Sequence, residues 1–451
     1  ALSSAASDVY KRQSHMHAPY TGVRFMMRPN GRAFKDERVT IMAFGLTKKE
    51  LSWVLYDVGN SAFVMLSTAL IPVYFASIAD PGSSVVVAWG YAETVASLVL
   101  ALLMPVLGSL ADLAGNKKKF LVGFAGTGAV ACAALGIPEH ALVFLVVYVI
   151  AAIMLNGSMV FYDAFLVDAT TEERYDKVSS HGYAWGYIGS CIPFIACLAV
   201  VLGGSSFGID AKLGMKIAFI ITAVWWVIFT VPVAKNVKQL HGKKRSDHVL
   251  RTTISGLKGT VKSIMKDKRL LFFMLAFFFY IDGVHTVIKM STSYGTDLGI
   301  DSTQLVLALL VTQFVAFPSA IAYGNLAKRF GTKRMLKVGV LAYFFIVLFA
   351  AFFLKSAVEF WILAICVGLF QGGIQALSRS EYGKLIPKER ANEYYGFFDI
   401  FGKYAAVMGT FLVSAFTQLT GSSSLGVLSI ALLFIVGFLF LRAMPPMLGD
   451  S

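Results

Sequence analysis

A short string, GSLADLAGNKKK at residues 108–119, returns later in the chain as GNLAKRFGTKRM at residues 324–335. The two copies are 216 residues apart, and two glycines, a Leu-Ala pair and a basic pair keep their places in both. The loop positions of interest are Gly108, Asp112, Gly115, Lys117 and Lys118 in the first copy and Gly324, Gly331, Lys333 and Arg334 in the second. A repeat at this distance predicts two halves of like architecture.

The loop itself carries two expectations. Gly108 ends an apolar run, so we expect a close turn there, which glycine permits. The carboxylate of Asp112 is expected to cap a following helix or to meet the end of another helix, where backbone N–H groups favour negative charge.

The composition places the chain in a membrane. Of its 451 residues 57% are hydrophobic and 15% are charged, whereas soluble domains have about 45–50% and about 25%. Mean hydropathy is +0.69. Twelve membrane helices of about 21 residues would use about 252 positions. These values exclude a disordered chain, a secreted disulfide scaffold and an ordinary soluble enzyme.

Apolar runs of spanning length recur from Trp53 to the C-terminus, and Thr47 with Glu50 has the spacing of a capping box before the first of them. Helices are the spanning element that fits, because strands of a membrane barrel alternate in polarity over about ten residues. We place twelve spans at about 52–78, 84–107, 119–137, 141–167, 181–203, 213–234, 270–293, 303–323, 335–354, 357–378, 393–414 and 424–442.

The segments between the spans alternate in charge. Those after spans 2, 4, 6, 8 and 10 carry clusters of Lys and Arg, and those on the other side carry almost none, with Lys212 and Lys355 the main examples. Basic segments mark the cytoplasmic side, so both termini are predicted to be cytoplasmic, at the inner membrane if the chain is bacterial. The net charge of +14 then follows from topology and requires no nucleic acid.

The repeat and the charge pattern together predict the domain organisation. Residues 42–234 and 270–451 are predicted to form two six-helix bundles, joined by a basic cytoplasmic linker at 235–269 with 11 basic and 2 acidic residues. This linker is either a solvated connection that fixes topology or a segment that contacts anionic lipid headgroups. Residues 1–41 are polar and lack a helical period, so we expect a disordered or non-native extension before a start at Met42.

The first copy of the repeated string resembles the loop between the second and third spans that marks the major facilitator superfamily. It departs from the family pattern at Leu113, where the family usually has a basic residue, and at Asn116. In the second copy Lys328 stands where Asp112 stands in the first, which puts a charge relay through that copy in doubt. The resemblance implies an all-α integral membrane fold of twelve helices, in two six-helix bundles, that works by alternating access.

Four longer strings resemble one branch of that superfamily, named after the fungal autophagy-related vacuolar amino-acid effluxer and including many bacterial members of unknown substrate. The strings are WVLYDVGNSAF (53–63), VFYDAFLVDAT (160–170), SSHGYAWGYIGS (179–190) and QGGIQALSRSEYGKLIPKERANEYYGFFDIFGKYAAVMG (371–409). The match extends from Met42 to Arg442 and implies transport of a small polar solute, an amino acid by analogy.

Ionisable residues inside apolar spans are costly, so each is a candidate for function. Asp57 in the first span, Asp163 in the fourth and Arg379 in the tenth lie near the cytoplasmic ends of their spans. We predict that Asp57 or Asp163 pairs with Arg379 as an inner gate that opens when the ion pair breaks. The alternative is that these residues extend to water at the membrane interface.

A second group of charges lies deeper in the seventh span. Asp282, His285 and Lys289 follow the spacing i, i+3, i+7 and therefore share one helix face. A carboxylate near an imidazole can exchange a proton near neutral pH, so we predict a proton-coupling site that also includes Glu93 of the second span. The alternatives are a static internal ion pair in the seventh span and a structural role for Glu93.

Further polar side chains within the spans are candidates for contact with the solute. The predicted cavity residues are Tyr56, Asn60, Asn156, Tyr162, Trp185, Gln371, Gln375, Asp399 and Lys403. Asp399 and Lys403 lie four residues apart and could instead neutralise each other. Gly182, Gly186 and Gly189 in the fifth span predict tight helix packing.

These features predict a monomeric secondary active transporter of a small polar solute, coupled to protons or another ion. No GxxxxGK[ST] loop is present, so ATP hydrolysis by that route is not expected, and we predict no enzymatic activity. The four cysteines lie in apolar runs without metal or redox spacing, and we expect neither a metal nor a cofactor. The competing hypothesis is a transporter-like sensor or lipid-handling membrane protein that moves no solute.

Overall fold

The structure is a computed structural model that describes residues 43–79, 85–243 and 249–445. The expected N-terminal extension at 1–41 lies outside these residues. The membrane-length helices and the shorter helices that continue them are α2 (Lys48–Ala69), α3 (Ile71–Ile78), α4 (Val85–Ala111), α5 (Lys117–Ala134), α6 (Ala141–Ala164), α7 (Leu166–Ala169), α8 (Tyr175–Gly203), α9 (Ala211–Asn236), α11 (Lys268–Asp297), α12 (Ser302–Phe330), α13 (Thr332–Phe353), α14 (Ala357–Leu385), α15 (Ala391–Thr420), α16 (Ser423–Ser429) and α17 (Ala431–Ala443). Among the described residues there is no strand.

The membrane-length helices agree with the all-helical prediction. Nine helices of the described chain are long and apolar enough to cross a membrane, or ten if α2 and α3 form one span. Helices α5 and α15 lie at the positions predicted for spans three and eleven but are not among the nine. Helix α5 begins with three lysines among its 18 residues, so composition alone does not mark it as a span.

The first predicted span is broken, not continuous. Helices α2 and α3 meet at Leu70 at an angle of 44°. The break follows from Pro72 in the first turn of α3, because proline donates no backbone hydrogen bond and its ring clashes with the carbonyl four residues earlier. At the other end of α2, Thr47 and Glu50 form the predicted capping box, with Glu50 N–H donating to Thr47 Oγ1 at 3.2 Å.

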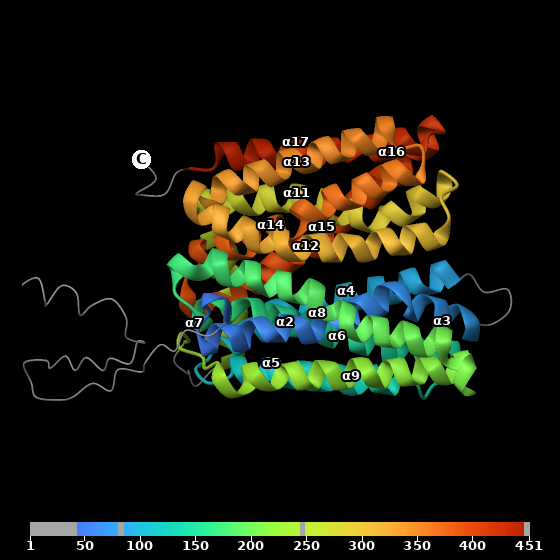
Figure 1. The fold of residues 1–451 in the computed structure, drawn as a ribbon. Coiled ribbons are helices and arrows are strands. Elements are labelled where there is room, and N and C mark those ends of the chain that lie inside the picture. The colour runs from blue at the N-terminus through green and yellow to red at the C-terminus, as the bar shows by residue number, and fades with distance from the viewer. Residues whose placement is uncertain (1–42, 80–84, 244–248, 446–451) are drawn as a thin grey trace, which may run out of the picture. The chain divides into compact units, whose positions relative to one another are not determined.

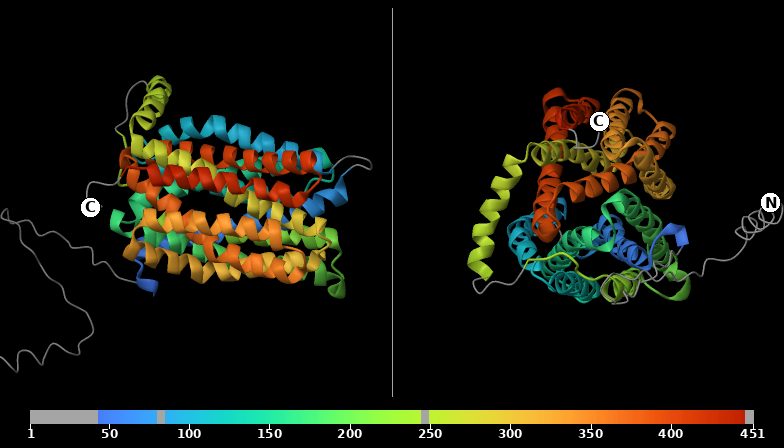
Figure 2. Two further views of the ribbon diagram at one scale, coloured as in Figure 1. Left: turned by 90° about the horizontal axis from the view of Figure 1, so that it is seen from above. Right: turned by 90° about the vertical axis from the view of Figure 1, so that its left-hand side faces the viewer.

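Helices from the two halves of the chain lie in two groups. The first-half helices, residues 48–236 (blue to green), lie on one side, and the second-half helices, residues 268–443 (yellow to red), lie on the other (Figure 2, right). Helices α8 and α12 pack together across this division, as do α15 and α4. One end of the helices carries α7 (left in Figure 1) and residues 237–243; we name it the linker end.

The basic linker is partly helical, which its charge did not predict. Helix α10 (Val249–Lys266) runs across the linker end of the other helices, along the outside of both groups (Figure 2, yellow-green). It contacts α4 of the first half and α11 of the second. Apolar and basic residues alternate along α10 with a helical period, which is typical of an amphipathic helix. The helix contains too few apolar residues to be identified as a membrane span.

Candidate functional site

The guanidinium of Arg379 on α14 lies at the division between the halves, near the linker end. Its side chain is 1% exposed, so it does not extend to water as the alternative required. Nη1 lies 2.9 Å from Asp163 Oδ1 on α6 and 3.6 Å from Asp57 Oδ2 on α2. The structure therefore brings the three predicted gate residues together, with Arg379 between two carboxylates of the opposite half.

Aromatic rings and a serine complete the surroundings of the guanidinium. Its carbon lies 4.7 Å from the ring centre of Trp53, 5.2 Å from Tyr162 and 4.4 Å from Tyr183, within the range of cation–π attraction. Nε donates to Ser179 Oγ and Nη2 donates to Ser179 O, both at 2.9 Å. All of these contacts of the Arg379 guanidinium are to residues of the first half. Because Arg379 belongs to the second half, its side chain connects the two halves.

Glycines on α8 make room for this network. A Cβ on Gly182 would lie 2.8 Å from Arg379 Nη2 and 2.9 Å from Tyr162 Oη. The same atom on Gly186 would lie 3.0 Å from Ser61 Oγ, and on Gly189 2.6 Å from Val58 Cγ1. The predicted tight packing of these glycines is thus present, and at Gly182 the neighbour is the charged network itself.

The first copy of the repeated loop meets the start of α15 in the other half. Asp112 Oδ1 accepts from Asn392 N at 2.9 Å and Oδ2 accepts from Glu393 N at 3.0 Å. The carboxylate thus meets the end of another helix, one of the two outcomes expected of it. Burial raises the pKa of Asp112 to about 6, although nearby Lys117 and the bonds from Asn392 and Glu393 act in the opposite direction.

The close turn predicted at Gly108 is wrong. Helix α4 continues through this position to Ala111, and a Cβ on Gly108 would lie 2.6 Å from Asn392 O. The glycine is needed for close approach of two helices, not for a turn. The backbone turn falls at Gly115, whose φ is +83° and favours glycine.

The second copy of the loop meets α8 of the first half in a matching way. A Cβ on Gly324 would lie 3.1 Å from Asp176 O, and Asp176 is 216 residues before Asn392. Here the carboxylate belongs to helix α8 and not to the loop. Asp176 Oδ2 accepts from Thr332 Oγ1 at 2.7 Å and from Lys384 Nζ at 2.8 Å. Asp176 thus supplies the charge that Lys328 does not.

The lysines of the two loops bind a buried carboxylate and carbonyl groups at helix ends. Lys117 Nζ lies 2.6 Å from Asp168 Oδ2, and both side chains are buried. Lys118 Nζ donates to Ala234 O at 2.7 Å, and Lys333 Nζ donates to Met444 O, in both cases at the C-terminal end of a helix. Arg334 is exposed and Gly331 has a φ of +87°.

The linker passes through this end as part of the network. Asp168 Oδ1 accepts from Leu240 N at 2.8 Å and His241 N at 2.9 Å. Lys243 Nζ then reaches Glu393 Oε2 at 2.7 Å. The linker is therefore fastened to both halves at its first residues.

The three seventh-span residues differ in burial and in their hydrogen-bond partners. Asp282 is fully buried, and its Oδ1 accepts from Gly409 N at 2.9 Å and Thr286 Oγ1 at 3.3 Å. His285 is partly buried and Lys289 is exposed. Among the described residues no hydrogen bond or ion pair joins Asp282 to either of them. The face of α11 that carries these three residues is covered by α15 at Asp282, whereas two turns later, at Lys289, it is exposed.

Glu93 and the α15 charges lie elsewhere. Glu93 is exposed on α4 and its Oε1 accepts from Tyr148 Oη of α6, a contact between neighbouring helices. Asp399 is partly buried. The side chain of Lys403 lies outside the described part of the structure, so its pairing with Asp399 stays a prediction.

The predicted cavity residues are dispersed among several environments. Those that bond within the first half are Tyr56 (to Ser158 Oγ, 2.6 Å), Asn60 (to Tyr56 O, 3.0 Å), Asn156 (to Ala152 O, 2.8 Å) and Tyr162 (to Asp57 Oδ2, 3.1 Å). Trp185 of α8 packs edge-on against Phe317 of the second half. Gln371 lines a cavity of about 50 Å³ between α11, α12 and α14, beside Gln313, whereas Gln375 is partly buried nearer Arg379 in sequence.

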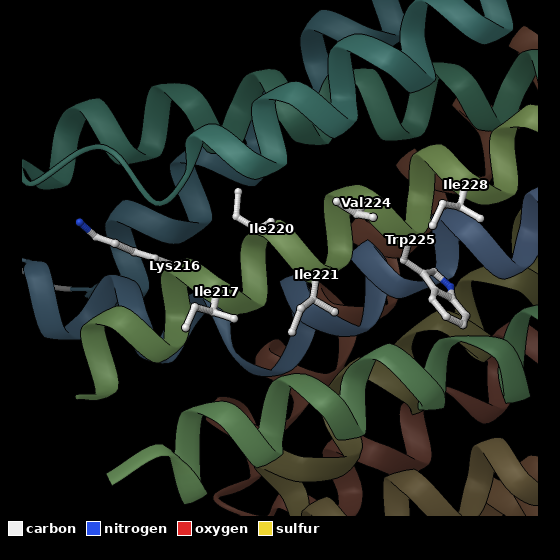
Figure 3. A pocket seen from close by; sticks show the side chains of 7 residues that line it. All are labelled: Lys216, Ile217, Ile220, Ile221, Val224, Trp225 and Ile228. Carbon is white, nitrogen blue, oxygen red and sulfur yellow. The ribbon is translucent and has the colours of Figure 1, made fainter. Parts of the chain in front are cut away.

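A larger hollow of about 510 Å³ lies on α9, away from these residues (Figure 3). It is lined by Lys216, Ile217, Ile220, Ile221, Val224, Trp225 and Ile228. An apolar outward face on a membrane-length helix meets lipid acyl chains, so this hollow is not assigned to a polar solute.

The partners that complete the network carry no distinctive sequence pattern of their own. Ser179 and Glu393 lie near helix starts in strings that were quoted only for resemblance, and Asp176 lies between two of those strings. The 216-residue offset is the signal that connects Asp176 to Asn392 at the α15 start. A further string, GSSFG at 204–208, matches the G-x-S-x-G pattern of hydrolases. It occupies a 3₁₀ turn after helix α8, not the strand-to-helix turn which that chemistry needs.

Membrane-length helices with charged contacts between two halves define an integral multi-pass membrane protein. The family model described as "Vacuole effluxer Atg22 like" matches residues 82–447. The chain therefore belongs to the Atg22-like branch of the major facilitator superfamily, a family of transporters and not of enzymes. This confirms the resemblance of the quoted strings.

Two curated relatives show the range of the branch. The chain is 46% identical over 408 residues to YxiO of Bacillus subtilis, described as an uncharacterized MFS-type transporter, covering 88% of this chain and 95% of that one. It is 26% identical over 283 residues to autophagy-related protein 22 of Cryptococcus neoformans. That match covers 58% of this chain, and it spans about half (48%) of the fungal protein.

Solved structures agree on the fold. The transporter FucP in the outward conformation superposes with a TM-score of 0.68 at 14% identity, over 88% of this chain and 99% of that one. The proton:xylose symporter XylE superposes with a TM-score of 0.66 at 10% identity, over 88% and 94%. Both are members of the major facilitator superfamily.

Proposed function

We propose that the chain is a secondary active transporter that moves a small polar solute by alternating access. The observation that carries the proposal is the Arg379 network, a buried charged contact between halves at one end of the helices. Such a contact must break if the halves separate at that end, and a buried ion pair is costly to leave unpaired. It therefore has the properties of a gate.

The proposal includes the twelve-helix arrangement in two six-helix bundles, 42–234 and 270–451, with α5 and α15 as spans. The linker end is the cytoplasmic side by the distribution of basic residues, at the inner membrane if the chain is bacterial. The described contacts between the halves then correspond to a conformation closed toward the cytoplasm. Anionic lipid at 235–269 and a monomeric state belong to the same proposal.

Proton coupling is proposed at Asp282. This carboxyl is fully buried, and among the described atoms its Oδ2 has no hydrogen-bond partner and neither oxygen forms an ion pair. A buried carboxyl in such a place binds a proton more readily than one in water. His285, Lys289 and Glu93 remain candidates for steps of proton transfer. The similar fold of a proton:xylose symporter supports ion coupling, and the name of the effluxer family supports transport. An amino acid, which the resemblance of the quoted strings implies, is the first solute to test.

The experiment is flux in proteoliposomes. Purified protein is given candidate amino acids, sugars and peptides, first in a thermal-shift screen and then with an internal pH dye. A transporter moves protons or labelled solute when a stabilising solute is added; a sensor or a lipid-handling protein binds without flux. Exchange of the Asp163 and Arg379 charges tests the gate, because the swapped pair should restore part of the flux lost in each single variant. No recovery in the double variant contradicts the pairing.

A further inference from the structure

We propose that helix α10 is a membrane-surface helix that binds anionic lipid headgroups and thereby holds the linker end closed. The proposal narrows the lipid contact to one helix face and gives it a consequence for conformation. The second part rests on the proposed alternating access, whereas the first part stands without it.

The two faces of α10 have different chemistry. Thr260 and Ile264 are buried against the protein. Lys258, Lys262 and Lys266 are exposed and follow at i, i+4 and i+8, so they form one stripe. Between Val249 and Lys266 the sequence contains no acidic residue, so no charge within the helix neutralises this stripe.

Apolar side chains lie beside the lysine stripe on the outside of the helix. Val261 is 42% exposed and Met265 is 65% exposed. A linker that is merely solvated gains nothing from exposed apolar side chains at helical spacing. Lysines beside apolar residues on a helix that runs across the membrane helices (Figure 2) are the features of a helix that lies in the headgroup region. Anionic headgroups supply the complementary charge.

The buried face of α10 contacts the residues that hold the two halves together at the linker end. Thr260 Oγ1 donates to Glu393 Oε1, and Lys243 Nζ reaches the other carboxylate oxygen of Glu393 at 2.7 Å. Arg390 binds the same carboxylate, with Nη2 at 2.8 Å from Oε1. Glu393 opens α15 beside Asp112 of the first half. Linker residues on both sides of 244–248 thus hold one carboxylate at the junction of the halves.

Headgroups that hold α10 in this position therefore favour the closed arrangement. A lysine near an anionic surface contributes about 1 kcal/mol, equivalent to about a fivefold change in population. Loss of each of the three lysines should weaken the lipid-dependent preference for closure by up to about fivefold.

The experiment uses the full chain in nanodiscs of zwitterionic lipid, with or without about one third anionic lipid. Two readouts are recorded after replacement of the native cysteines. An environment-sensitive fluorophore on M265C reports whether α10 enters the headgroup region. Spin labels on E173C and E389C, both exposed at the linker end of opposite halves, report closure. Anionic lipid should shift the fluorophore to an apolar environment and shorten the label distance.

The variant K258Q/K262Q/K266Q should lose both responses. The matched control K119Q/K328Q/R329Q removes three exposed cations outside α10 and should keep both. Equal responses in the lysine variant and the native chain would overturn the proposal, as would a fluorophore that ignores anionic lipid. If inorganic phosphate in zwitterionic nanodiscs reproduces the shift, the ligand is a soluble anion and the membrane proposal is wrong. A fluorophore response without a change in label distance retains lipid binding and rejects its effect on closure.

Discussion

Asp163 and Arg379 form a 2.9 Å ion pair and are 216 residues apart, the offset that separates Gly108 from Gly324. They are therefore the same position in the two halves of the repeat. Lys388 and Glu172 share this property, with Nζ and Oε2 3.5 Å apart. Equivalent positions of two copies can contact each other only near the pseudo-two-fold axis that relates the copies. The gate residues therefore lie close to this axis.

Asp163→Asn should weaken the closed arrangement more than Asp57→Asn. The first change removes the partner at 2.9 Å and the second removes the one at 3.6 Å. Breaking a buried pair that leaves its partner uncompensated costs about 3–5 kcal/mol. Asp57 still faces Arg379 in the Asp163 variant, so we expect a loss below this range. Distances between labels at Glu173 and Glu389 measure the effect.

The matched control for these variants is Asp210→Asn. Asp210 caps α9 at the other end of the molecule through a bond from Leu213 N, which an asparagine oxygen can accept. Closure should be unchanged in this variant. Wild-type distances in the Asp163 variant would show that the pair does not hold the halves together.

Gly182→Ala should disturb the same network by size instead of charge. The added methyl would lie 2.8 Å from Arg379 Nη2, and overpacking of this kind costs about 1–3 kcal/mol. Gly126→Ala on α5 is the control, because no atom lies within 4 Å of its added methyl. Flux and label distances should change in the first variant only; equal behaviour of the two alanine variants would contradict the packing described for α8.

Acidification should favour the closed arrangement through Asp112. Its pKa is raised to about 6 by burial in this arrangement, and a carboxyl exposed to water after opening returns to about 3.9. The closed form thus binds the proton more tightly, and its population relative to the open form should rise about tenfold between pH 7 and pH 5. The rise occurs as pH falls through 6 and is absent above it.

Asp112→Asn provides the comparison for the pH experiment. Asparagine retains one oxygen, which can accept from Asn392 N, but its NH2 group cannot accept from Glu393 N and it does not titrate in this range. The difference between the pH profiles of label distance in the native chain and in the variant isolates Asp112. Identical profiles would show that another group is responsible.

Asp282→Asn should abolish proton-coupled uptake and leave counterflow exchange intact. The asparagine oxygen can still accept from Gly409 N, so the contact of α11 with α15 is kept while the proton site is lost. Thr286→Val removes the other bond to Oδ1 without removing an ionisable group, and should keep coupling. Proton flux and counterflow are measured on both variants; coupled uptake by the Asp282 variant would reject the site.

The spans and gate could be predicted because their signals are strong. Long apolar runs and rare internal charges stand out in any sequence, and the structure places Asp57, Asp163 and Arg379 in one network. The cavity and the seventh-span site could not be predicted to the same degree. Asp282 and Lys289 share a face by spacing, but spacing does not say how far along the helix the neighbouring helix α15 covers that face.

Other differences have equally local causes. Glycine serves turns and close helix contacts alike, so Gly108 was ambiguous until its neighbour Asn392 was known. Helix α10 is too polar to be distinguished from a solvated linker by composition. Ser179 and Asp176 are ordinary polar residues near a helix start, and their importance comes from Arg379 and Thr332, which the fold brings from the other half.

The opposite charges at positions 163 and 379 also bear on the origin of the chain. In a symmetric dimer of identical subunits, equivalent residues on the two-fold axis have the same identity. An ancestor of that kind would have placed two aspartates or two arginines together at this point, where they repel. An acid–base pair here requires two copies that can mutate separately, so this particular closure could arise only after the ancestral half had been duplicated.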